Sequence, residues 1–110
     1  MSAEIQNATA QRFVEVVNRG DTDAFLALFP QDGVVDDWGR RFVGHEAIRG
    51  WSDKEFIGAK GRMDVTNVEE AEDEVRITAD WTSNHYTGPS LFVLTLQGEQ
   101  VQEMGIADAS

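Results

Sequence analysis

Residues 34–51 read VVDDWGRRFVGHEAIRGW, and this stretch predicts a short hairpin that runs into a helix. The alternation in 34–37 is typical of a strand, Trp38-Gly39 supplies a turn, and Phe42-Val43 lies in the returning strand. After Gly44, apolar residues recur at helical spacing and predict a helix over roughly 45–57. A hairpin placed directly before a helix restricts the folds that the rest of the chain can adopt.

Asp37 is the candidate functional residue of this stretch. Side chains alternate along a strand, so Val35 and Asp37 share one face while Val34 and Asp36 share the other. If the first face looks into the core, Asp37 sits among apolar neighbours, where ionisation is disfavoured and proton transfer becomes possible. Asp36 is then expected to face solvent. The alternative is a surface hairpin in which both aspartates are solvated.

The segments on either side of the hairpin differ in their periodicity. Before it, an apolar stripe predicts a helix over about residues 3–18, and Asp21 can cap a second, short helix that Pro30 stops. From Gly61 the period changes to two, and four antiparallel strands are expected at Met63–Glu69, Val75–Ser83, Leu91–Gln97 and Gln100–Ala107. Helices followed by an antiparallel sheet define an α+β fold.

Composition excludes several classes of function. The 110 residues suit one domain, and no apolar run approaches the ~18 residues that predict a membrane-spanning helix. The net charge of −11 argues against nucleic-acid binding, which needs a basic surface. The chain has no cysteine and shows no signal peptide, which fits a cytoplasmic protein. The acidic residues around Glu69–Glu74 are expected at a solvated hairpin tip.

The strand predicted at Leu91–Gln97 is apolar on both faces. Phe92, Leu94 and Leu96 form one face, but Leu91 and Val93 make the opposite face apolar as well. In so small a domain, a strand that is buried on both sides indicates a partner chain, and we therefore expect a homodimer.

The order of these elements resembles the nuclear transport factor 2-like superfamily, which includes SnoaL-like polyketide cyclases and ketosteroid isomerases. The likeness is carried by RFVEVVNRGDTDAFLALFPQDGVVDDWG at 12–39, GHEAIRGW at 44–51 and LTLQGEQVQEMGIAD at 94–108. It covers nearly the whole chain and implies one such domain over 1–110. The implied fold is a cone of three N-terminal helices packed in a strongly curved, mainly antiparallel sheet. The resemblance also implies an apolar pocket at the wide end and a homodimer formed through the outer faces of the sheet.

The resemblance assigns the family's site residues unevenly to this chain. Asp37 falls on the proton-shuttling aspartate, so it is the candidate general base. The positions of the two hydrogen-bond donors to the enolate oxygen are Phe13 and Phe92, and neither can donate. Steroid isomerase chemistry in its known form is therefore not expected. The resemblance implies a pocket for a small apolar molecule, with these candidate lining residues: Phe13, Trp51, Trp81, Phe92 and Met104. The alternative is that these side chains simply fill the core.

The remaining polar residues give weaker signals. His85 lies at a strand end; if the alternation through Val75–Trp81 continues, it faces the pocket side and could act as an acid beside the base Asp37. The alternative is an ordinary loop-end histidine. His45 lacks a second histidine at metal-binding spacing, so we expect no metal and no cofactor. Arg40-Arg41 is interpreted as a solvated pair. Two functions stay open: an isomerase, cyclase or dehydratase acting on a carbonyl or polyketide-like substrate, or a non-catalytic binding or dimerisation domain.

Overall fold

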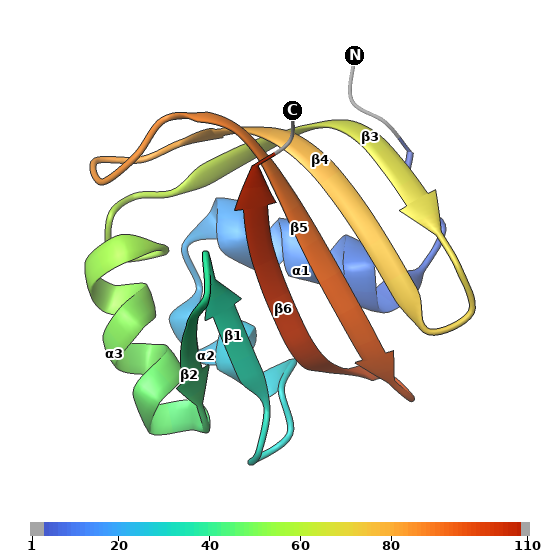
Figure 1. The fold of residues 1–110 in the computed structure, drawn as a ribbon, viewed down its shortest axis with the longest axis horizontal. Helices are drawn as coiled ribbons and strands as arrows, with labels where there is room; N and C mark the ends of the chain where they lie inside the picture. Colours follow the sequence, from blue (N-terminus) through green and yellow to red (C-terminus); the bar gives the residue numbers. More distant parts are fainter. Residues whose placement is uncertain (1–3, 109–110) are drawn as a thin grey trace.

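Two helices come first, a third follows a short β-hairpin, and all three occupy one side of a six-stranded sheet (Figure 1). The structure, a computed structural model, describes residues 4–108. The helices are α1 (Ala8–Arg19), α2 (Thr22–Ala27) and α3 (His45–Glu55). The strands are β1 (Val34–Asp37), β2 (Arg40–Val43), β3 (Arg62–Glu70), β4 (Glu74–Thr82), β5 (Gly88–Gln97) and β6 (Gln100–Asp108). The predicted α+β class is confirmed, with a curved sheet that is not closed.

Polar caps define the first two helices. The Asn7 side chain accepts from the backbone N–H of Ala10 at 3.0 Å, and this N-cap starts α1. Gly20, in the left-handed region at φ 75°, ends the helix, and Asp21 then caps α2 through the backbone N–H of Ala24. The predicted start of the first helix near residue 3 was therefore wrong for residues 4–7, and residue 3 lies outside the described residues.

The third helix is shorter than the sequence predicted. α3 begins at His45 as expected but ends at Glu55, not at residue 57. The backbone N–H groups of Ile57 and Gly58 bind the Oγ and carbonyl oxygen of Ser52, which replaces the last helical turn with a tight loop. The loop turns Phe56 and Ile57 into the core, where both are buried.

The sheet has the order β2-β1-β6-β5-β4-β3. The strands β3 to β6 form an antiparallel succession, as the period-two pattern predicts. The hairpin β1–β2 joins the edge of β6, and β1 runs parallel to it, with Val35 opposite Met104 and Asp37 opposite Ile106. This register places Asp37 on the same face as the buried side chains of β5 and β6.

The core lies between the helices and the concave face of the sheet. In Figure 1, α1 passes behind β5 and β6, and Phe13 of α1 meets Phe92 of β5 with ring centroids 6.2 Å apart. Inward residues of β4 are fully or almost fully buried, as the alternation predicts: Val75, Ile77, Ala79 and Trp81. No helix within residues 4–108 is long and apolar enough to cross a membrane.

Candidate functional site

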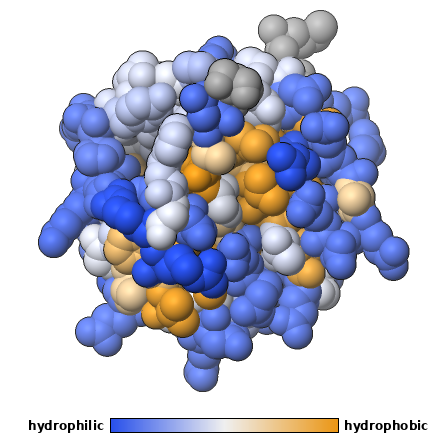
Figure 2. Space-filling view, in the orientation of Figure 1, coloured by the Kyte–Doolittle hydropathy of each residue, from blue (hydrophilic) through white to orange (hydrophobic). Residues whose placement is uncertain are grey.

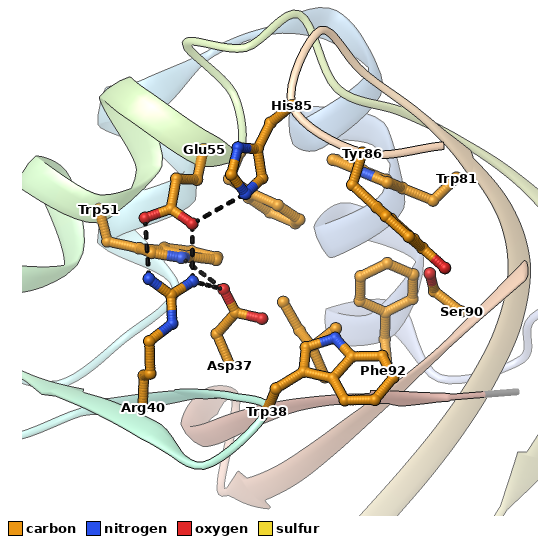
Figure 3. A pocket seen from close by; sticks show the side chains of 12 residues that line it. Asp37, Trp38, Arg40, Trp51, Glu55, Trp81, His85, Tyr86, Ser90 and Phe92 are labelled. Carbon is orange, nitrogen blue, oxygen red and sulfur yellow. Dashed lines mark hydrogen bonds and ion pairs between the residues drawn. The ribbon is translucent and has the colours of Figure 1, made fainter. Parts of the chain in front are cut away.

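A cavity of about 280 Å³ opens between α3, the β1–β2 hairpin and the start of β5 (Figure 3). This volume is near the lower end of the roughly 300–1,000 Å³ typical of small-molecule sites. Half of its twelve lining residues have large, mainly apolar aromatic side chains: Trp38, Trp51, Phe56, Trp81, Tyr86 and Phe92. The other lining residues are Asp37, Arg40, Glu55, His85, Ser90 and Ile106. We call this site the aromatic cavity; it contains all three tryptophans of the chain.

Stacked rings build one wall of the aromatic cavity. Phe56, which the loop after α3 turns inward, lies between Trp51 and Trp81 with centroid distances of 4.8 and 4.7 Å. The interplanar angles of 23° and 13° describe a nearly parallel stack. Offset stacking of this kind stabilises rings beyond the area they bury. The faces of Phe56 are therefore covered on both sides, and the stack gives the cavity an apolar wall.

Asp37 projects from the end of β1 into this aromatic cavity with 8% of its surface exposed. Its Oδ2 accepts hydrogen bonds from the Trp51 indole, at 3.0 Å, and from the Arg40 guanidinium. Figure 3 shows the second carboxylate oxygen, Oδ1, directed into the space between the rings. One oxygen thus fixes the carboxylate while the other faces the space that a ligand would occupy.

The turn after Asp37 brings Trp38 to the mouth of the aromatic cavity. Trp38 and Gly39 both have positive φ, 55° and 91°, as a tight hairpin turn requires. The neighbouring Asp36 carboxylate steadies the turn by accepting from the Gly39 N–H at 2.8 Å. A bulky residue in the left-handed region costs about 1 kcal/mol or more. The strained residue, Trp38, lies at the entrance to the cavity. Its side chain is largely exposed there and can contact a ligand.

Arg40 links Asp37 to a second carboxylate that sequence reasoning missed. Its guanidinium binds Glu55 through two hydrogen bonds, at 2.6 and 3.1 Å, in addition to Asp37. The hydrogen bonds from Arg40 hold the pKa of Glu55 below its ordinary value, against the opposing effect of burial. The same pairing, with Glu55 as the largest cause, raises the pKa of Arg40. Arg40 and Glu55 are therefore both charged near neutral pH.

His85 completes this charged cluster at the rim. Its Nε2 lies 3.1 Å from Oε1 of Glu55, while about half of its side chain stays exposed. The charge of this pair depends on whether the imidazole is protonated. Asp37 and His85 thus line the same aromatic cavity, and Glu55 and Arg40 connect them.

The structure sorts the candidate lining residues into two groups. Trp51, Trp81 and Phe92 line the aromatic cavity. Phe13 and Met104 are fully buried in the core and do not line it. Phe13 packs against Phe92 and Phe25, with centroid distances of 6.2 and 6.4 Å, so it supports the wall from behind.

Arg40 stays exposed, with 52% of its side chain accessible, as the interpretation of Arg40-Arg41 as a solvated pair expects, but its ion pairs with Asp37 and Glu55 were not predicted. The spacing contained a signal: Trp51 and Glu55 are four residues apart on α3, so they share a helix face, and Arg40 is directly opposite Asp37 across the hairpin. Tyr86 and Ser90 were also missed, because nothing in their local sequence distinguishes them from other strand-end polar residues. Within residues 4–108, no group of three or more histidine or acidic side chains is arranged to hold a metal ion.

Comparison with solved structures shows the same fold in proteins of low sequence identity. A protein from Sinorhizobium meliloti, described as a candidate polyketide cyclase, has a TM-score of 0.78 at 20% identity, over 90% of this chain and 93% of that one. A protein with a ketosteroid isomerase-like fold from Catenulispora acidiphila, in complex with trimethylamine, has a TM-score of 0.77 at 21% identity, over 96% and 89%. A Mycobacterium tuberculosis protein in complex with estradiol-17β-hemisuccinate has a TM-score of 0.77 at 17% identity, over 89% and 88%.

The family assignment follows from the sequence match. The SnoaL-like domain family matches residues 10–104, which is most of the chain. The chain therefore belongs to the SnoaL-like domain family, within the nuclear transport factor 2-like superfamily. No curated protein sequence matches it.

Proposed function

We propose that this protein binds a small apolar carbonyl or polyketide-like molecule in the aromatic cavity, where Asp37 acts as a general base. One observation carries the proposal: Oδ2 of Asp37 is held by Trp51 and Arg40, while Oδ1 faces an apolar space. A carboxylate placed in this way is positioned for proton transfer and shielded from bulk water. The resulting reaction class is isomerisation, cyclisation or dehydration by proton shuttling.

The proposed step is abstraction of a proton from a carbon next to a carbonyl. The C–H bond breaks, the proton moves to Oδ1 of Asp37, and the electron pair passes to the carbonyl oxygen as an enolate. Return of the proton to another carbon gives an isomer, while loss of a hydroxyl gives a dehydrated product. His85, at the rim of the same aromatic cavity, is the candidate acid for a leaving hydroxyl.

Hydrogen exchange of a probe ketone tests this proposal. 2-Indanone is flat, apolar and carries acidic hydrogens beside its carbonyl; their replacement by deuterium in D₂O is followed by proton NMR. We expect the protein to accelerate the exchange over buffer and Asp37→Asn to abolish the acceleration. The matched control is Asp36→Asn, because Asp36 lies on the opposite face of β1 and should leave the rate unchanged. An Asp37→Asn variant that exchanges 2-indanone as fast as the wild type would contradict the base role.

A second candidate function is ligand binding without catalysis. It is favoured by the identity of Phe13 and Phe92, which are apolar and buried where the resemblance assigns hydrogen-bond donors. Such donors often contribute several kcal/mol of transition-state stabilisation. For this function, we expect 2-indanone to bind without exchange above the buffer rate, and Asp37→Asn to leave its affinity unchanged.

We also propose that two copies associate through the outer face of the sheet. Leu91 and Val93 point away from the core and stay half-buried, and Gly105 opposite Val93 adds no side chain. Figure 2 shows an apolar patch on this face, surrounded by hydrophilic side chains. A contiguous apolar patch with a polar rim is typical of a protein–protein interface.

The sequence without cysteine supports a cytoplasmic location.

A further inference from the structure

Buried polar side chains are rare among the described residues, and they point to a second functional feature. Only three polar or charged residues are buried between residues 4 and 108: Asp37, Ser52 and Ser90. Ser52 serves the fold, because its Oγ accepts from the Ile57 N–H in the loop after α3. The other two line the aromatic cavity. Burying a polar group is unfavourable unless it is hydrogen-bonded, so a buried hydroxyl in an apolar wall calls for an explanation.

Ser90 lies on the inward face of β5 with 3% of its surface exposed. Its inward neighbours along the strand are Gly88 and Phe92, and across the sheet it pairs with Ala79. Its Oγ donates to the carbonyl oxygen of Gly88 over a distance of 3.4 Å, which is at the long limit for a hydroxyl donor. A hydroxyl held by so long a bond can rotate toward a better acceptor within the cavity.

Tyr86 brings a second hydroxyl to the same place. A Cβ at Gly88 would lie 2.7 Å from the Tyr86 hydroxyl oxygen, so the glycine leaves the room that this oxygen occupies. Both hydroxyls therefore gather around Gly88. Figure 3 shows them on the side of the aromatic cavity away from the Asp37, Arg40 and Glu55 cluster. Aromatic rings fill the wall between the two polar ends.

We propose that the Ser90 and Tyr86 hydroxyls form a subsite that donates hydrogen bonds to an acceptor oxygen of the ligand. The ligand class is an apolar molecule with a carbonyl oxygen at one edge. The proposal deepens the proposed function, on which it rests for the choice of the aromatic cavity as the ligand site. It supplies hydrogen-bond donors that Phe13 and Phe92 cannot provide, one from β5 and one from the loop before it.

A matched pair of probes tests the subsite by binding alone. 2-Indanone and indane share one skeleton, and only the first has a carbonyl oxygen. Intrinsic fluorescence reports their entry, because all three tryptophans line the aromatic cavity. In an apolar cavity without donors, indane binds more tightly, since the ketone loses its hydrogen bonds to water. With the donor pair in place, we expect the wild type to prefer 2-indanone.

The variants assign this preference to the hydroxyls. We expect Ser90→Ala to lower the ratio of the indane to the 2-indanone dissociation constant about tenfold, as for a lost buried hydrogen bond, and Tyr86→Phe to lower it by a smaller factor, because Tyr86 is 47% exposed. Thr95→Val is the control, because it removes a hydroxyl of β5 that faces the opposite side of the sheet. The carbonyl carbon resonance of ¹³C-labelled 2-indanone should move downfield on binding to the wild type and less in either variant.

Several results overturn the subsite. They are a wild type that binds neither probe or prefers indane, and a ratio that stays within twofold of the wild type in both hydroxyl variants. A failure of the general-base role gives a different result. In that case Asp37→Asn exchanges 2-indanone as fast as the wild type, while Ser90→Ala and Tyr86→Phe still weaken the preference for 2-indanone. Loss of the preference in the hydroxyl variants, with normal binding of indane, supports the subsite whether or not exchange occurs.

Discussion

The indole N–H of Trp51 donates to Oδ2 of Asp37 at 3.0 Å, a hydrogen bond between α3 and the end of β1. Both groups are buried, and the carboxylate also binds Arg40. The contact joins the hairpin to the third helix at the wall of the aromatic cavity. It also fixes which carboxylate oxygen faces the ligand space, because Trp51 and Arg40 occupy the same oxygen.

Replacing Trp51 by phenylalanine should destabilise the fold more than the loss of ring area explains. Trp51→Phe keeps an aromatic ring beside Phe56 but removes the donor to a buried carboxylate. Losing a hydrogen bond to a charged group costs about 1–3 kcal/mol. The control is Trp81→Phe, a residue that stacks on the other side of the same ring. Urea denaturation should give a free energy of unfolding that is lower for Trp51→Phe than for Trp81→Phe by about this amount; equal values would contradict it.

The ion pair of Glu55 and Arg40 predicts a pH-dependent contribution to stability. The pKa of Glu55 is lowered in the folded protein, so its contribution is present above the unfolded value, about 4.3, and is lost as the pH falls through the folded value. Glu55→Gln should therefore lower the melting temperature at pH 7, and the difference from the wild type should shrink steadily below pH 4. Asp53→Asn, an exposed acid on the same helix, is the control and should show a smaller effect.

Much of this fold could be predicted from periodicity alone. The change from helical spacing to alternation near Gly61 separates the helices from the strands β3 to β6, and the period of two correctly placed Asp37 on the inward face. The parallel pairing of β1 with β6 was not predicted, because it joins segments about seventy residues apart. Local sequence carries no information on such a contact.

The site residues that could not be predicted from the sequence also have a physical explanation. Phe13 of α1 and Phe92 of β5 are both buried aromatics on the apolar face of their element, yet only Phe92 meets the aromatic cavity. A cavity is a part of the core that side chains leave unfilled, so its position depends on packing across several elements. Arg40 illustrates the same point: its side chain is half exposed, as its charge suggests, but the local sequence does not indicate that two carboxylates from β1 and α3 converge on it.

Two glycines next to the site should respond to alanine in opposite directions. A Cβ at Gly61 would come within 2.1 Å of the Trp81 ring and 2.8 Å of the Phe56 carbonyl oxygen, so Gly61→Ala must displace the stacked wall. Gly50 lies inside α3 with open space around its Cβ position. Gly50→Ala should raise stability by about 0.5–1 kcal/mol, since alanine favours the helix. Thermal unfolding of both variants checks this; a Gly61→Ala protein as stable as the wild type would contradict the close packing of Trp81.

From the apolar outer face of the sheet we predict a dimer that a single charged substitution dissociates. Leu91 and Val93 of β5 form the centre of the apolar patch, and a glutamate at either place would bury an unpaired charge in the contact between two copies. Light scattering at micromolar concentration should give twice the chain mass of 12.2 kDa for the wild type and the single mass for Leu91→Glu or Val93→Glu. Gln97→Glu adds a charge to the same strand at an exposed end and should stay dimeric. Circular dichroism separates dissociation from unfolding, because both patch residues point away from the core and the monomer should keep its native spectrum. A wild type that scatters as a monomer would leave the apolar face without the partner that we assign to it.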